Sequence, residues 1–486
     1  MLKQIIRRWL FAIACVVTLV ALFYAEEDWR GKHAWDTYKR EREAKGESFE
    51  WSSVVPPPVP DRENFATTPL FAELFPKPPH SPRLRAMQLP VHPRYGQDRR
   101  EGAWQLGRAE NLSMWQECFT NTDLMAALSK YGPMLQEITE ASRRPYGRFP
   151  IRYEDGFAAL LPHLNYMRGV ARTYRLRALV ELSAGQSDAA LADVQTILRL
   201  ADKLNGEPIF ISFLVRVAML DIATQPIWEG LAAHRWDESQ LAALQAPLEE
   251  VDQCASLAKM FQGERRFAYH TALWLHSHPT GVLALFTRSS LFDSPDDEPG
   301  VWLGRAIPSG WIDQNELATD RFYAKTVLPA LDVEHRRISP EKMKQVEDVI
   351  ETMRATPYTA LCKYVLLPIT VVAKKTAVSQ TGVDEALVAC ALDRYRLAHG
   401  EFPEKLEALT PQFIAKLPHD VIKGEPLHYR RTAGGQYVLY SVGWNETDDG
   451  GQVAMRAVSQ DFNRGDWVWF SQPQPQLSAS ERKQVD

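Results

Sequence analysis

The chain has 486 residues, 45% of them hydrophobic, which is enough for about two or three ordinary cores and excludes a disordered protein. Its 56 basic and 61 acidic residues give a formal net charge of -5, so no overall attraction draws it to phosphate backbones or anionic lipid. Nucleic acid is therefore not expected as a partner.

Residues 9–25 form an uncharged apolar run, which at about 1.5 Å per residue spans roughly 25 Å and is just long enough to cross a bilayer. Basic residues precede the run and acidic residues follow it: Lys3, Arg7 and Arg8, then Glu26, Glu27 and Asp28. The positive-inside bias predicts a single-pass transmembrane helix in the cytoplasmic (inner) membrane. Residues 1–8 would lie in the cytoplasm and the main domain in the periplasm or another extracytoplasmic space.

A cleaved signal peptide is the alternative for this run. Signal peptidase requires small residues at positions −3 and −1, and cleavage after Ala25 would place Phe23 at −3. The large phenylalanine favours a retained anchor.

Residues 26–109 are predicted to form a charged stalk followed by a proline-rich tether. Residues 29–49 are strongly charged and rich in helix formers, which indicates a solvated helix just outside the membrane. Residues 56–93 are dense in proline, which lacks a backbone donor and restricts the residue before it, so a regular helix or a central strand is not expected there.

Residues 110–380 are predicted to form an irregular helical domain. Apolar residues in 160–178 recur at steps of four and three, which places them on one stripe of a helix. A second helix is expected to begin at Ser187 as its N-cap and to stop at Asn205 and Gly206. The hairpin looks like one unit of a tetratricopeptide-type array, but no 34-residue recurrence flanks it. Further helices are expected at 209–233, 238–251, 252–276, 310–331 and 340–354.

Two groups of basic residues in this domain need an explanation: those inside apolar runs and a set of arginines on one helix. Two later apolar runs, 209–223 and 359–373, contain Arg216 and Lys363 and are too short and too charged to span a membrane, so we interpret them as core helices. Four arginines on the helix near residue 170 either bind an anion or, as we favour, form a solvated face with local ion pairs: Arg168, Arg172, Arg175 and Arg177.

The five cysteines are Cys15, Cys118, Cys254, Cys362 and Cys390, and no CxxC pair occurs. A zinc knuckle or thioredoxin-type site is therefore not indicated. The four outside the apolar run either form two disulfides in an oxidising compartment or remain free as small buried side chains, the interpretation that we favour.

Residues 381–470 change from helical to alternating periodicity. A helix is expected to stop at Gly400, a short helix to cover 403–409, and strands to form at 427–431, 436–442 and 466–470. Five short sequences occur in order: ALDRYRLAHGEFPEKLEAL, LPHD, GEPLHYRR, YVLYSVGWNETDDGG and DWVW. In these sequences, residues 386–470 resemble the C-terminal domain of the major pseudopilins of type II secretion, which implies a pseudopilin-like α+β module, while residues 471–486 form a polar tail.

The resemblance to pseudopilins has limits. The anchor lacks the Gly followed by Phe-Thr-Leu-x-Glu that a prepilin peptidase would cut, so the chain is not expected to be a pilin itself. As a whole, the chain also looks like envelope proteins of planctomycete and verrucomicrobial type, a likeness that implies no activity.

The resemblance also implies a calcium ion. Calcium takes six to eight oxygen ligands from a tight loop, and Asp448, Asp449 and Asp466 near Gly450 and Gly451 are the candidate metal ligands. An ordinary acidic turn is the alternative interpretation.

No catalytic residue is predicted. His270, His276 and His278 follow Glu264, but histidines at these spacings do not share one helical face. The sequence contains no GxSxG, P-loop or GxGxxG motif. The fold is thus expected to be mainly α, and the chain to act by binding or assembling with another envelope component. Two alternatives stay open: an exported hydrolase with its site in the helical domain, and a helical-repeat scaffold.

Overall fold

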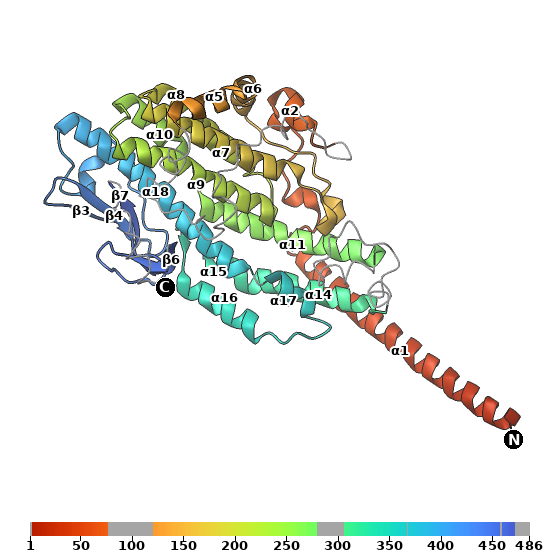
Figure 1. The fold of residues 1–486 in the computed structure, drawn as a ribbon. Helices are drawn as coiled ribbons and strands as arrows, with labels where there is room; N and C mark the ends of the chain where they lie inside the picture. Colours follow the sequence, from red (N-terminus) through yellow and green to blue (C-terminus); the bar gives the residue numbers. More distant parts are fainter. Residues whose placement is uncertain (1, 76–119, 279–305, 367, 457–458, 472–486) are drawn as a thin grey trace.

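The computed structural model describes residues 2–75, 120–278, 306–366, 368–456 and 459–471. It is mainly helical, with a long N-terminal helix that projects from a helical body and small antiparallel sheets near the C-terminus (Figure 1). At this level the fold class predicted from the sequence is confirmed.

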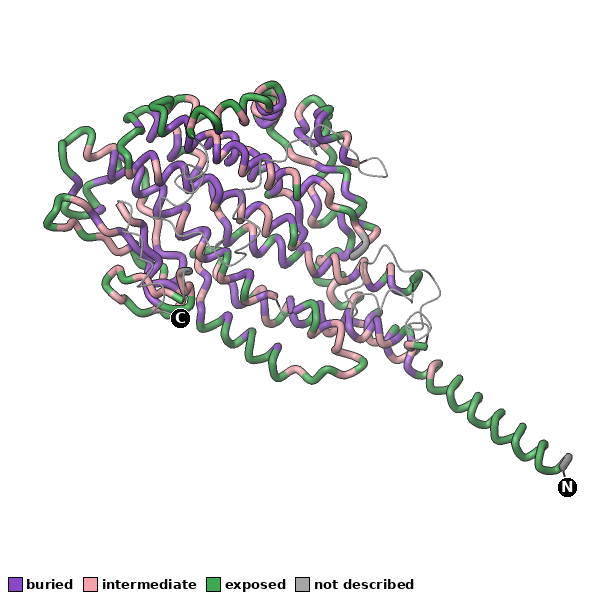
Figure 2. The backbone as a smooth tube through the Cα atoms, viewed as in Figure 1, coloured by how far each residue is buried: buried purple, intermediate pink, exposed green. Residues whose placement is uncertain are grey.

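The N-terminal helix α1 runs without a break from Leu2 to Glu43. Its apolar half is exposed (Figure 2), as expected of a membrane anchor or a signal sequence. Its charged half is not the solvated stalk expected from the sequence, because it packs along α14 (Ser309–Phe322). Trp35 and Tyr38 are buried there. Glu27 is buried on the same face, where it accepts from the Trp311 indole N–H of α14.

The described part of the proline-rich tether also packs onto the body. Short helical turns occur at Trp51–Ser53, Asp61–Glu63 and Phe65–Thr67, followed by α2 (Pro69–Ala72). Phe65 and Phe71 are fully buried. Residues 76–109 of the expected tether lie outside the described residues.

The first part of the body is a layer of antiparallel helices. It contains α5 (Asn121–Ser129), α6 (Gly132–Ser142), a 3-10 turn at Tyr153–Ala158, α7 (Pro162–Ser183), α8 (Ser187–Lys203), α9 (Phe210–Ala232), α10 (Glu238–Glu249) and α11 (Gln253–Ser277). The predicted hairpin is α7 and α8, which pack on each other and on α9. The predicted cap is wrong: Gln186 is the N-cap residue, and the Ser187 hydroxyl instead donates to the Arg235 carbonyl.

Helix α9 is long and apolar enough to span a membrane, but 67% of its most apolar window is buried within the body. It is therefore the core helix expected from the sequence. Arg216 on α9 is buried, whereas the Lys363 amine donates to the carbonyls of Glu351 and Met353. Arg177 on α7 forms a local ion pair with Glu181 and a shorter one with Asp193 of α8, with 2.7 Å between its Nε and Oδ2 of Asp193. Its side chain is only 22% exposed, so Arg177 does not lie on the solvated face expected from the sequence.

The second part of the body begins with α14, which continues through a π-helical turn (Tyr323–Val327) into α15 (Leu328–Ala330). After it come the short strands β1 (Leu331–Asp332) and β2 (Arg337–Ile338), then α16 (Pro340–Thr352), α17 (Ala360–Leu366) and α18 (Ile369–His399). Ser339 caps α16 by accepting from the Lys342 N–H, and Pro340 occupies its first turn, where a missing N–H costs nothing. Helix α18 ends at Gly400, whose φ of 83° is readily adopted only by glycine.

Three C-terminal strands lie where the sequence places them. These are β3 (His428–Arg431), β4 (Tyr437–Ser441) and β7 (Trp467–Phe470), which form one antiparallel sheet in the order β3-β4-β7. β5 (Val453–Arg456) pairs with β6 (Ser459–Gly465), and these two strands were not predicted. The expected short helix is the 3-10 turn Leu406–Leu409. The larger sheet shares one apolar core with α9, α10 and α18. The boundary expected at residues 380 and 381 falls inside α18, so the helix joins the two regions.

Candidate functional site

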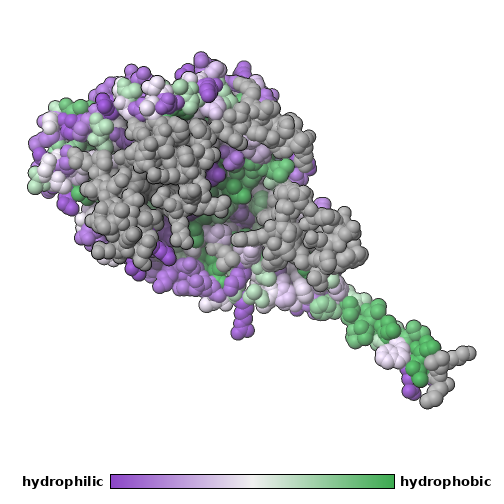
Figure 3. All heavy atoms as spheres, in the orientation of Figure 1, coloured by the Kyte–Doolittle hydropathy of each residue, from purple (hydrophilic) through white to green (hydrophobic). Residues whose placement is uncertain are grey.

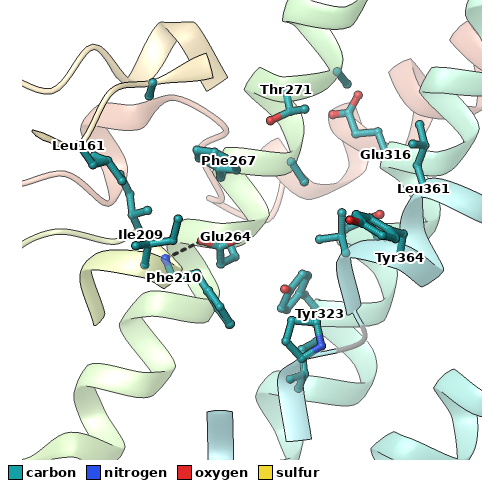
Figure 4. A pocket seen from close by; sticks show the side chains of 18 of the residues that line it. Leu161, Ile209, Phe210, Glu264, Phe267, Thr271, Glu316, Tyr323, Leu361 and Tyr364 are labelled. Atoms are coloured by element: carbon teal, nitrogen blue, oxygen red, sulfur yellow. Dashed lines mark hydrogen bonds between the residues drawn. The ribbon is translucent and has the colours of Figure 1, made fainter. Parts of the chain in front are cut away.

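A large cavity opens into the body between α7, α9, α11, α14 and α17. Its volume is about 900 Å³, within the range of about 300–1,000 Å³ that is typical of small-molecule and cofactor sites. Figure 4 shows the side chains that surround it, which come from parts of the chain as distant as Leu161 and Tyr364. Most of the lining is aliphatic or aromatic.

Two helices supply the long walls of the cavity, each with one face. The α11 residues follow helical spacing and are Glu264, Phe267, Ala268, Thr271, Ala272 and Leu275. Those of α14 and its π-helical extension are Ile312, Asn315, Glu316, Thr319 and Tyr323. Because residues three and four apart share a helix face, the carboxyl groups of Glu264 and Glu316 are held among apolar neighbours instead of in solvent.

The rim of the cavity exposes large hydrophobic side chains. Leu160, Ile211, Tyr364 and Val365 line the cavity, and their exposed fractions are 38%, 55%, 42% and 41%. In Figure 3 hydrophobic residues colour a hollow on the face of the body shown there. A group of apolar side chains around a concave surface is typical of a binding site rather than of an ordinary surface.

One end of the cavity lies close to the place where α1 leaves the body. Ile312 and Leu275 line that end and share a small apolar cluster with Trp274, Ile307 and Leu361. The residue before Ile312, Trp311, contacts the ring of Phe23 edge-on, with 6.4 Å between centroids. Phe23 belongs to the exposed apolar half of α1.

Glu264 lies on the α11 wall, where its Oε1 accepts the backbone N–H of Phe210 at 2.8 Å. Its side chain keeps some accessible surface, which faces the cavity, although protein atoms surround it on other sides. Removal from bulk water raises the pKa of Glu264 to about 7, against the opposite effect of the Phe210 N–H. The carboxyl is therefore poised between its neutral and charged forms at neutral pH.

Glu316 lies on the α14 wall and is more deeply buried, with only 5% of its surface exposed. Its Oε1 atom has no hydrogen-bond partner among the described residues. Burial raises the pKa of Glu316 well above its ordinary value, and the charges of Asp313 and Asp320 act in the same direction. The hydroxyl of Thr271, also in the cavity wall, lacks a partner among the described residues too.

Three basic side chains of the described residues around Glu316 have other partners. Arg265 binds Asp320 through two hydrogen bonds of 3.0 and 2.8 Å. The Lys39 amine donates to the Tyr269 hydroxyl at 2.8 Å, and His276 pairs with Asp313. Among the described residues that line the cavity, Arg168 on α7 is the basic one.

The predicted metal ligands Asp448, Asp449 and Asp466 lie in and beside the loop between β4 and β5. Each carboxylate accepts hydrogen bonds from its own set of donors. Asp466 is buried and accepts from the backbone N–H groups of Gly451 at 2.6 Å and Asp449 at 3.2 Å. Burial raises the pKa of Asp466 despite these two donors.

The other two carboxylates also have local donors. Asp448 accepts from the Gly450 N–H and the Tyr440 hydroxyl, and Asp449 from the Asn445 amide. The described residues contain no group of three or more His, Cys, Asp or Glu that could hold a metal. Hydrogen-bond donors thus point at the carboxylate oxygens that calcium would need. The observed geometry of these residues does not fit the ion, and calcium stays a prediction that comes from the resemblance.

The three histidines at the end of α11 do not meet. His270 stacks on Trp51, with 5.0 Å between centroids, His276 pairs with Asp313, and His278 stacks on Trp274. Cys254, Cys362 and Cys390 are free and buried, in agreement with the favoured interpretation, and Cys15 is free and exposed. Cys118 lies outside the described residues.

Neither glutamate of the cavity wall was predicted from the sequence as a site residue, since Glu264 stood out only as a neighbour of the histidines and Glu316 not at all. A signal was present for Glu264, because its neighbours three and four residues away are Met260, Phe261, Phe267 and Ala268. Glu316 gave no such signal, because Asp313 and Asp320 are among its neighbours at the same spacings. Searches for known relatives add nothing here: no family model, curated protein or solved structure matches the chain. The cavity must therefore be interpreted from its own chemistry.

Proposed function

We propose that this chain is a single-pass membrane protein of the cell envelope that binds a hydrophobic molecule in the cavity between α11, α14 and α17. The observation that carries the proposal is an apolar cavity of about 900 Å³ at the end of the body from which the apolar half of α1 projects. A molecule that partitions into the bilayer would have the cavity within reach.

The basic residues before the apolar run support a cytoplasmic N-terminus and an extracytoplasmic body. The packing of α1 supports retention of the anchor, because the helix continues from the apolar run into the body without a break. A C-terminal fusion of the full chain to alkaline phosphatase should be active, and the same fusion to a cytoplasm-dependent fluorescent protein should be dark. The opposite pattern would refute this topology.

The three-stranded sheet packed on α18 supports a pseudopilin-like fold for the C-terminal module. In this proposal the module stabilises the body, because it shares its core with α9, α10 and α18. Assembly with another envelope component would then involve a different surface from the cavity.

Binding can be tested on the full chain in lipid nanodiscs with a long-chain alcohol that carries a diazirine in its alkyl chain. After irradiation and digestion, we expect labelled peptides from the cavity walls on α11, α14 and α17, in addition to labelling of residues 9–25 in the bilayer. Labelling confined to residues 9–25 would overturn the proposal. The same result is expected if another part of the chain fills the cavity.

A matched pair of variants makes this test specific. Val365→Asp places a charge on the cavity rim, where the valine is 41% exposed, and should reduce cavity labelling several-fold. Val349→Asp makes the same change on α16, where the valine is 45% exposed and does not line the cavity. Because both valines are exposed, neither change is expected to prevent folding, and Val349→Asp should label like the unmodified chain.

A further inference from the structure

We infer that the hydrophobic molecule carries a cationic amine, which binds Glu316 while its alkyl part fills the apolar cavity. The inference rests on the binding function proposed above and identifies the chemical class of the ligand. Its starting point is a carboxyl side chain that is only 5% exposed, lines the cavity and has an oxygen without a hydrogen-bond partner among the described residues.

The position of Glu316 follows from two ion pairs between α11 and α14. Arg265 pairs with Asp320 at one end, and His276 pairs with Asp313 at the other. Glu316 lies between Asp313 and Asp320 on α14, so the part of α11 that faces it includes Ala268 and Ala272. These small side chains line the cavity and leave space beside the carboxyl group.

The surrounding charges favour a cation at this place. Asp313, Asp320 and Asp36 add negative potential at Glu316, and Lys39 is the positive group among the main influences on it. Since the Lys39 amine is bonded to Tyr269 and the Arg265 guanidinium is bonded to Asp320, neither cation supplies a counterion to Glu316. A buried carboxylate without a partner is costly, and an ammonium group would remove that cost.

Two more groups of the wall fit the same ligand. The Thr271 hydroxyl lacks a partner among the described residues and lines the cavity, so its oxygen is available to accept from an ammonium N–H. Glu264 lies seven residues before Thr271, roughly 10 Å along α11, and adds a second carboxyl to this side. An anionic head group would instead meet two carboxyl groups, and would have Arg168 on α7 as its partner.

The experiment compares three diazirine probes of equal chain length on the full chain in nanodiscs: a primary alkylamine, an alcohol and a carboxylic acid. Labelling of the cavity is divided by labelling of residues 9–25 in the same sample, which corrects for different partition into the bilayer. We expect this ratio to be at least about tenfold higher for the amine than for the alcohol, as one desolvated charge pair is worth more than about 1.4 kcal/mol.

Glu316→Gln keeps the size of the side chain and removes its charge, and it should lower the amine ratio to that of the alcohol while the alcohol ratio stays unchanged. Glu347→Gln, on the exposed side of α16, is the control and should change neither. If the alcohol labels the cavity and the amine has no advantage, the cationic ligand is refuted and the binding function stands. If the acid labels best and depends on Arg168, the head group is anionic and the inference is also refuted. If no probe labels the cavity, the binding function itself fails.

Discussion

Gly31 of α1 and Gly310 of α14 meet backbone to backbone, and a Cβ atom added at either would overlap main-chain atoms of the other helix. Asp28 strengthens the same crossing, because its Oδ1 accepts the Gly310 N–H at 2.9 Å. The apolar half of α1 therefore leaves the body in a direction that is fixed by this contact.

Replacement of Gly31 by alanine should destabilise the protein by about 1–3 kcal/mol, because the new methyl group has no space and the helices must separate. Thermal unfolding of the full chain in nanodiscs, followed by circular dichroism, would measure the change. Gly169→Ala is the control: it lies within α7 with nothing near its added Cβ, so alanine should be neutral or stabilise by up to about 1 kcal/mol. Equal melting temperatures for the two variants would contradict the close crossing.

Asp320 joins three segments, since it accepts from Arg265 of α11 and from the Tyr38 hydroxyl of α1 at 2.8 Å. Asp320→Ala would leave a buried guanidinium with Glu47 as its remaining ion-pair partner and should cost about 3 kcal/mol, as loss of one member of a buried pair usually does. Chemical denaturation would measure it. Asp348→Ala on the exposed side of α16 should stay within about 0.5 kcal/mol, and a similar small effect at Asp320 would show that the network is unimportant.

The raised pKa of Glu264, about 7 against an ordinary 4.5, makes stability depend on pH. The folded protein holds this proton up to a higher pH than the unfolded chain does. Below about pH 4.5 Glu264 is protonated in both states, so its raised pKa does not change the free energy of unfolding. As the pH rises from there through about 7, the free energy of unfolding falls progressively. Glu264→Gln cannot ionise and still accepts the Phe210 N–H.

The Glu264→Gln variant is therefore expected to match the unmodified protein near pH 4 and to be more stable by roughly 1–3 kcal/mol at pH 8, allowing for solvent in the cavity. Melting temperatures of both proteins measured from pH 4 to 8 give the difference. A difference that is constant over this range would mean that Glu264 is not held in its neutral form.

Chelation tests the calcium suggested by the pseudopilin resemblance. Because the Asp466 carboxylate already accepts two backbone N–H groups, we expect excess chelator to leave the melting temperature of the full chain unchanged. Asp466→Ala, by contrast, should lower stability by about 1–3 kcal/mol, since it leaves those donors unpaired. A melting temperature that falls on chelation and recovers with added calcium would restore the metal.

The sequence alone determined the features that depend on neighbouring residues. Residues 9–25 are apolar enough to form a helix that is exposed over most of its length and meets the body near Phe23 and Tyr24. The end of α18 at Gly400 follows from the backbone freedom of glycine. The strands near 428–431, 437–441 and 467–470 were predicted because alternating side chains and turn residues are local signals. Ser187 failed as a cap because its hydroxyl found a partner in a distant segment, the Arg235 carbonyl.

Only the tertiary structure decided how these elements meet. One face of α1 carries Glu27, Gly31, Trp35 and Tyr38. The many charged residues between them concealed this spacing in the sequence. The face is buried because α14, some 280 residues later, packs against it. The cavity has the same origin. Its walls come from α9, α11, α14 and α17, and a space between helices depends on how far apart their packed side chains hold them. No local pattern encodes that distance, so Glu316 could be identified as a candidate site residue only from the packed arrangement of the helices.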